Sequence, residues 1–202
     1  MRFMTKVADI MILNLLFILT SLPVITIGAA WTSLYYVSMK LVRDEEGSIV
    51  HSFFHSFRMN FRQATVLWVG TVVLYAALIA DLLILAQIDS PIAAAMNTGV
   101  LMIGIVILMI LQYLFPLIAR FDASIKQTLK NACLMAVANL PKTILMTAFV
   151  AGTAFISLFN GYTLPVASVI FVFIGFGLIA FGNSAILVKI FDDYIPKKEE
   201  TL

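Results

Sequence analysis

The sequence predicts an all-α fold, namely a polytopic transmembrane helical bundle with about six membrane-embedded segments and two amphipathic cytoplasmic segments. Of its 202 residues, 62% are apolar and only 12% are charged, and the mean hydropathy is +1.04. Four long stretches, residues 10–39, 63–80, 90–119 and 143–188, contain no Asp, Glu, Lys or Arg. Soluble domains carry about 45–50% apolar and about 25% charged residues. An ordinary water-soluble fold and a disordered chain are therefore both excluded.

Charge and cysteine content exclude further classes of protein. The 13 basic and 11 acidic residues leave a net charge of +2, which is too small for the basic surface of a nucleic-acid-binding domain. The single cysteine, Cys133, excludes an intramolecular disulfide and a metal site built from several cysteines.

The later charge-free stretches predict four spans, because one crossing needs about 20 apolar residues. We expect membrane segments at residues 64–86 and 98–118. The last stretch is long enough for two segments, 143–159 and 164–188, separated by a turn-forming cluster at residues 160–165. The whole chain, residues 1–202, is then a single membrane domain.

The first charge-free stretch is too long for one span and short for two, and residues 20–23 and 26–28 interrupt it. All 13 basic residues fall in four groups, and none lies in the connections 87–97 or 160–165. An even number of crossings would place every Lys and Arg on the cytoplasmic side, as the positive-inside rule favours. We therefore expect a hairpin of segments 3–22 and 24–41 with both termini cytoplasmic. A re-entrant hairpin is an open alternative. A cleavable signal peptide is disfavoured, because Asp9 interrupts its basic region and apolar sequence continues to Leu41.

Two cytoplasmic segments show helical amphipathicity. In residues 47–63 an apolar stripe of Ile49, Phe53, Phe57 and Phe61 opposes His51, His55, Arg58 and Arg62, which suits either a membrane interface or the protein's own surface. In residues 120–141 an apolar side formed by Phe121, Ile125, Leu129 and Ala136 opposes Arg120, Gln127, Lys130 and Asn131. The candidate residues for cytoplasmic interactions are Arg43, Asp44, Glu45, Glu46, Arg58, Arg62, Arg120, Asp122 and Lys130.

Motifs for catalysis are missing. The sequence contains neither a P-loop nor a nucleophile elbow, and the His51–His55 pair lacks the glutamate of a zinc-protease motif and a third ligand. We therefore expect no enzymatic activity, no catalytic residue, no cofactor and no metal. Three polar residues lie deep in predicted spans, namely Asn14, Gln112 and Asn183. They either bind a solute or form hydrogen bonds between helices.

Several short motifs together resemble the YesL-like family of uncharacterised bacterial integral membrane proteins. They are NLL (14–16), LPVITIG (22–28), LYY (34–36), KLVRDEEG (40–47), FFHSF (53–57), NFRQA (60–64), PLIARFD (116–122) and LKNA (129–132). The resemblance implies a location in the bacterial cytoplasmic membrane and a role accessory to carbohydrate ABC transporters, with permease subunits as partners. It implies no catalytic residues. A small-solute transporter or channel is the alternative function.

Overall fold

The computed structural model describes residues 2–45, 47–159 and 163–194, and every regular element in these ranges is helical. The elements in chain order are α1 (Arg2–Ser21), η1 (Val24–Thr26), α2 (Ile27–Val42), α3 (Ile49–Leu85), α4 (Pro91–Arg120), α5 (Ile125–Ala138), α6 (Leu140–Leu158), α7 (Thr163–Ile170), η2 (Phe171–Gly175) and α8 (Phe176–Tyr194). The predicted all-α class is confirmed. The expected turn at residues 160–162 lies outside the described residues.

The first two helices form the expected hairpin. Pro23 stands before η1, where its missing N–H and fixed φ suit the start of a helical turn. The far ends of the two helices meet, since Lys6 of α1 pairs with Asp44, just beyond α2, at 2.6 Å. The tip of the hairpin is held to α3, because the indole N–H of Trp68 donates to the carbonyl of Val24 at 2.8 Å.

Residues 47–63 and the predicted span 64–86 are joined in one helix, since α3 runs without a break over 37 residues. Ser48 caps its start by accepting a hydrogen bond from the backbone N–H of His51. No proline follows before Leu85 and Gly70 is the sole glycine, so nothing in the sequence ends the helix between the amphipathic and apolar parts. At about 1.5 Å per residue, α3 is about 55 Å long.

The boundaries around the second amphipathic segment also differ from prediction. Helix α4 continues through Pro116 to Arg120, so it extends two residues beyond the predicted segment 98–118. The amphipathic helix α5 is shorter than residues 120–141, because Ser124 caps its start and Asn139 separates it from α6. Pro141 lies in the first turn of α6, where a proline removes no hydrogen bond within the helix.

The apolar side predicted for residues 120–141 is only partly buried, since Ala136 is buried and the larger residues Ile125 and Leu129 are exposed. The buried residues of α5 are Thr128, Ala132 and Ala136, while Ile125 and Leu129 are 40% and 46% exposed. Small side chains allow α5 to approach its neighbours closely, and the larger apolar side chains point outward. In a membrane protein an apolar stripe does not by itself identify the core, because lipid also accepts it.

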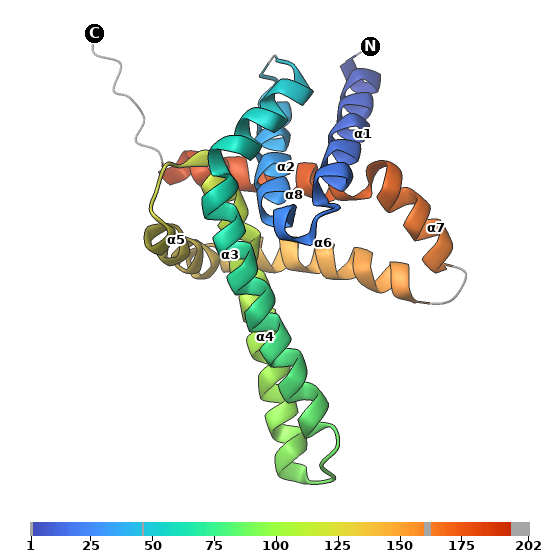
Figure 1. Ribbon diagram of the computed structural model, residues 1–202, viewed down its shortest axis with the longest axis vertical. Helices are drawn as coiled ribbons and strands as arrows, with labels where there is room; N and C mark the ends of the chain where they lie inside the picture. Colours follow the sequence, from blue (N-terminus) through green and yellow to red (C-terminus); the bar gives the residue numbers. More distant parts are fainter. Residues whose placement is uncertain (1, 46, 160–162, 195–202) are drawn as a thin grey trace.

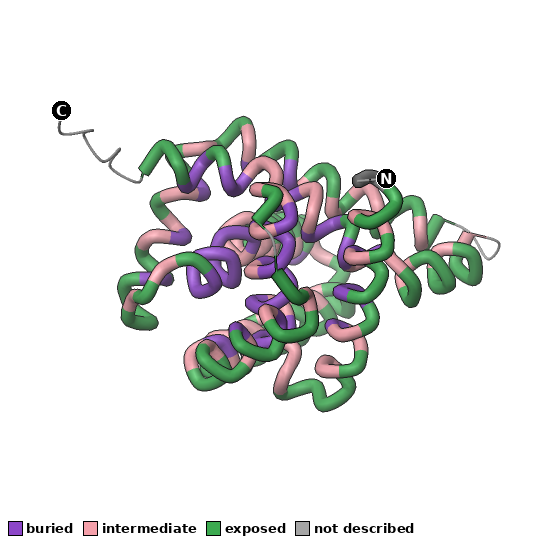
Figure 2. The backbone as a smooth tube through the Cα atoms, turned by 90° about the horizontal axis from the view of Figure 1, so that it is seen from above, coloured by how far each residue is buried: buried purple, intermediate pink, exposed green. Residues whose placement is uncertain are grey.

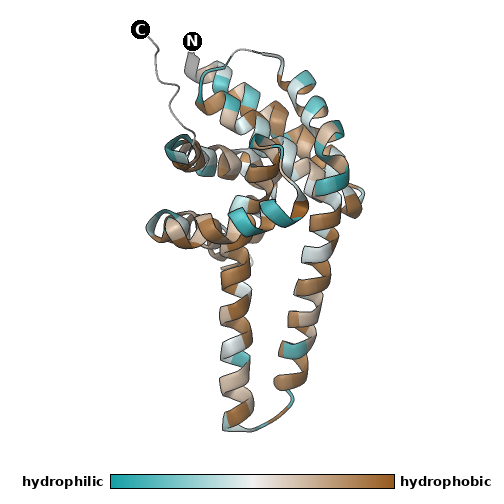
Figure 3. Cartoon of the chain, turned by 90° about the vertical axis from the view of Figure 1, so that its left-hand side faces the viewer, coloured by the Kyte–Doolittle hydropathy of each residue, from teal (hydrophilic) through white to brown (hydrophobic). Residues whose placement is uncertain are grey.

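The distal halves of α3 and α4 form a two-helix arm, residues 69–85 and 91–108, that extends beyond the rest of the molecule (Figure 1). Within the arm only Ala93 is buried. Its surface is apolar over most of its length (Figure 3). The Tyr75 hydroxyl joins the two helices by donating to the carbonyl of Gly104 at 3.0 Å.

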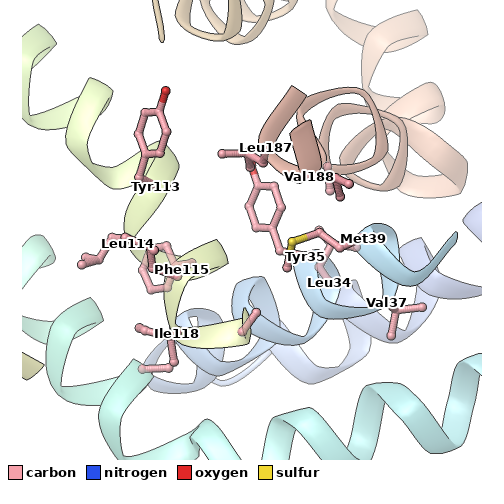
Figure 4. Close-up of a cluster of buried hydrophobic side chains, with 14 of the residues drawn as sticks. Leu34, Tyr35, Val37, Met39, Tyr113, Leu114, Phe115, Ile118, Leu187 and Val188 are labelled. Atoms are coloured by element: carbon pink, nitrogen blue, oxygen red, sulfur yellow. The ribbon is translucent and has the colours of Figure 1, made fainter. Parts of the chain in front are cut away.

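The core lies where α2, α4 and α8 meet, and buried positions gather in the middle of the molecule when it is viewed along the arm (Figure 2). Leu34, Tyr113, Leu187 and Ile190 are fully buried. Tyr35 of α2 lies against Leu187 of α8 (Figure 4). Helix α2 is thus the central element, although it is the shortest of the helices before α5.

Five described helical stretches are long and apolar enough to cross a membrane, namely Met4–Ser21, Ile49–Leu85, Pro91–Arg120, Leu140–Leu158 and Thr163–Tyr194. The chain is a multi-pass membrane protein. Helix α2, the core of the predicted segment 24–41, has 16 residues and measures about 24 Å, which is shorter than a hydrocarbon layer of about 30 Å.

Candidate functional site

Asn14 connects α1 to an irregular turn in the last helical stretch. Its side-chain amide donates to the carbonyl oxygens of Phe171 at 3.0 Å and Val172 at 2.8 Å. Its carbonyl oxygen accepts from the backbone N–H of Gly177 at 2.9 Å. Phe171–Gly175 is π-helical, so the ordinary i to i+4 bonding is interrupted there. Asn14, which is fully buried, satisfies the backbone groups that this interruption leaves open.

Glycine makes this contact possible. A Cβ atom at Gly177 would lie 2.8 Å from Cγ2 and 2.9 Å from the carbonyl oxygen of Ile10. Only a residue without a side chain allows α1 and α8 to come this close. Asn14 is therefore a helix-packing residue, and its hydrogen-bonding atoms are occupied by backbone.

Gln112 and Asn183 make fewer contacts. The Gln112 amide donates to the hydroxyl of Thr147 at 2.7 Å and so joins α4 to α6. The Asn183 amide donates to the Tyr35 hydroxyl at 3.4 Å and joins α8 to α2. The carbonyl oxygen of each side chain is buried without a hydrogen-bond partner among the described residues.

One cavity of about 290 Å³ lies between α2, α3, α4, α6 and the last helical stretch. Its lining includes Gln112, Tyr35 and the aromatic side chains Trp31, Trp68 and Phe115. Asn14 and Asn183 are not part of this lining. The three deep polar residues thus do not line a common cavity, and each of them takes part in contacts between helices.

Charged side chains join the ends of four helices. Besides Lys6 and Asp44, Arg43 pairs with Asp192 at the end of α8, and Lys142 of α6 lies 3.8 Å from Asp193. We call this region, with Lys40 and Arg120, the basic end. Tyr35 of α2 contacts Asn183 of α8, and Arg43, just beyond α2, pairs with Asp192. These contacts join the end of α2 to the end of α8, although α8 lies across α2 (Figure 1).

The candidate interaction residues divide into two sets. Arg43, Glu45 and Arg120 line one small pocket at the basic end, and Asp44 binds Lys6. Arg58, Arg62, Asp122 and Lys130 are exposed on other surfaces and have no ion pair within the described part of the chain. Glu46 lies outside the described residues.

The aromatic stripe of the first part of α3 is divided between the core and the surface. Phe53 is fully buried, whereas Phe54 and Phe61 are 38% and 39% exposed. The imidazole rings of His51 and His55 stack with centroids 6.2 Å apart and line a shallow groove with Arg58. Within the described residues no three potential metal ligands come together.

Sequence reasoning missed the acidic partners at the basic end and the bridging role of Gln63. Asp192 and Asp193 follow the last apolar stretch. Because two of the other apolar stretches end at basic residues, these acids could have been predicted to form ion pairs with basic residues at helix ends. Gln63 donates to the carbonyl of Ala123 at 3.0 Å and to the hydroxyl of Thr128 at 3.1 Å, which fixes α5 to α3. No periodic pattern indicates that pairing.

Comparison with known proteins agrees with the motifs. The family described as "Protein of unknown function, DUF624" matches residues 10–82. The chain is also 28% identical over 158 residues to the uncharacterized protein YesL of Bacillus subtilis (strain 168), covering 77% of this chain and 73% of that protein. These matches confirm the resemblance to the YesL-like family. No solved structure matches the chain. The family match runs from within α1 through α2 and most of α3, and the YesL match covers most of the chain.

Proposed function

We propose that this YesL-like protein is a non-enzymatic accessory of a carbohydrate ABC transporter in the bacterial cytoplasmic membrane, with both termini on the cytoplasmic side. The observation that carries the proposal is a pair of exposed surfaces, one on the first half of α3 and one on α5. On each surface a cation lies close in the helix to an exposed large apolar side chain, Arg58 and Arg62 with Phe61 on α3 and Lys130 with Leu134 on α5. Arginine together with aromatic side chains is typical of protein interfaces.

The orientation is supported by the ion pairs. The start of α1, the end of α2, the start of α6 and the end of α8 are joined by pairs that involve Lys6, Arg43 and Lys142. If α2 leads the chain back to the side of the membrane on which α1 starts, the number of membrane-embedded segments is even. In that case, the described basic groups lie on one side of the membrane, and the positive-inside rule favours that side as the cytoplasmic one.

The proposal that a carbohydrate ABC transporter is the partner rests on the family resemblance. The proposal that the chain is not an enzyme rests on the sequence. The chain has no P-loop of its own, so energy for uptake would come from a partner ATPase. The two surfaces proposed to contact the permease subunits are the first half of α3 and the outward face of α5.

Co-purification tests the proposal. Permease subunits of a carbohydrate ABC transporter from the same bacterium should be recovered with the chain from membranes dissolved in a mild detergent. Arg62→Glu should lower that recovery, whereas Lys189→Glu, an equal charge reversal at an exposed position of α8, should not. Recovery of the chain alone, while the permeases remain assembled with each other, contradicts the accessory role.

The alternative function is transport of a small solute through the bundle. The cavity lined by Gln112, Tyr35 and two tryptophans favours it. Solute flux into vesicles that contain only this chain would support the alternative. If Gln112→Leu leaves that flux unchanged, the cavity is not the path of the solute.

A further inference from the structure

A pocket of about 100 Å³ at the basic end brings three cations together. It is lined by Tyr36, Met39 and Lys40 of α2, Arg43 and Glu45 of the following loop, and Ala119 and Arg120 of α4. Arg43 is held by its ion pair with Asp192. The Lys40 ammonium lies 5.8 Å from the centroid of the Tyr36 ring. Neither Lys40 nor Arg120 has a carboxylate within 4 Å among the described residues.

The positions of Lys40 and Arg120 in the sequence indicate that the pocket lies at the boundary between the apolar and polar layers of the membrane. Lys40 is the first charged residue after the apolar stretch 10–39, and Arg120 is the first after the stretch 90–119. The two residues that end these separate stretches line the same pocket. Such a boundary is where lipid phosphates lie, and Tyr36 is of the aromatic type enriched there.

We propose that this pocket binds a phosphate group, supplied by the headgroup of an anionic phospholipid. Lys40, Arg43 and Arg120 outweigh Glu45 and Asp192 by one positive charge. Arginine holds a phosphate with two hydrogen bonds and lysine holds it as a point charge. Basic pockets between membrane helices on the cytoplasmic side bind anionic headgroups in this way. The buried Met39 and the Tyr36 ring give the glycerol and acyl part of a lipid an apolar wall, which free phosphate would not use.

The carbonyl ends of α2 and α4 also favour cations at this place, so the cations alone do not require a ligand. The experiment must therefore measure binding rather than stability. The inference rests on the membrane orientation proposed above, but its test does not involve a permease, so the two proposals fail separately.

The test counts lipids bound to the purified full-length chain by native mass spectrometry after addition of phosphatidylglycerol or phosphatidylcholine. Phosphatidylglycerol should bind preferentially, and Lys40→Gln and Arg120→Gln should each weaken its binding about fivefold. Lys189→Gln, an exposed cation outside the pocket, should leave it unchanged. Arg120→Lys keeps the charge and should retain most of the binding, which separates loss of the cation from misfolding.

A further arm adds inorganic phosphate as a competitor. Weak competition supports the lipid as the source of the phosphate. Displacement of the lipid at low phosphate concentration supports the same pocket chemistry with free phosphate as its ligand. Equal binding of the two lipids, or equal losses in Arg120→Gln and Lys189→Gln, overturns the proposal.

Discussion

Replacing Asn14 by alanine should destabilise the protein far more than the same replacement at Asn183. Both side chains are fully buried, so the two substitutions remove the same atoms from equally enclosed positions. Asn14 makes three hydrogen bonds of 2.8–3.0 Å to the backbone of the last helical stretch. Asn183 makes one of 3.4 Å and leaves its carbonyl oxygen without a partner.

The size of the effect follows from those bonds. A net hydrogen bond contributes about 1 kcal/mol in soluble proteins and about 0.6 kcal/mol between membrane helices. Three bonds give about 2–3 kcal/mol for Asn14→Ala, against at most about 1 kcal/mol for the bond lost in Asn183→Ala.

The assay is unfolding of the detergent-dissolved chain by increasing fractions of SDS, followed by circular dichroism. The difference in unfolding free energy between the two variants isolates the hydrogen bonds, since the cavity left by alanine is common to both. Asn14→Asp should resemble Asn14→Ala, because a carboxylate cannot donate to the two carbonyls. Equal destabilisation by the two alanine variants would refute the role assigned to Asn14.

Three further predictions concern packing and orientation. Gly177→Ala should destabilise the chain by about 1–3 kcal/mol in the same SDS assay, because its Cβ meets Ile10, whereas Gly99→Ala, with nothing within 4 Å, should be neutral or slightly stabilising. Trp68→Phe should cost about 1 kcal/mol and increase protease cleavage at the tip of the α1–α2 hairpin, because it removes the indole donor. Lys130 should resist an impermeant amine reagent in intact cells and react after the membrane is opened.

Each of these has a result that contradicts it. If Gly99→Ala is as damaging as Gly177→Ala, the close approach of α1 and α8 is not the cause. Unchanged cleavage in Trp68→Phe would mean that the hairpin tip is held by other contacts. Labelling of Lys130 from outside the cell would reverse the proposed orientation.

The features that the sequence predicted best are the ends of individual helices, because these depend on the residues of one segment alone. The charge-free stretches end at Lys40 and Arg120, and α2 and α4 end within three residues of these positions. The hairpin turn at Pro23 was predictable from its local conformational limits. Asn14 was correctly included among residues that form hydrogen bonds between helices, as one of two alternatives.

Features that depend on the neighbouring helices were not predictable. The buried face of α5 follows from small residues that fit against other helices, and the larger leucines remain at the surface. The π-helical turn cannot be read from Phe171–Gly175, because its bonding is completed by a side chain 157 positions earlier. The cation pocket likewise combines two helix ends that are distant in sequence.

The aromatic cavity has a practical consequence for spectroscopy. The chain contains two tryptophans, and both Trp31 and Trp68 lie along that cavity. The tryptophan fluorescence of the unlabelled protein therefore comes from residues beside this cavity. A molecule that enters or leaves the cavity should change the wavelength or the intensity of the tryptophan fluorescence, so the native chain already carries its own optical probe.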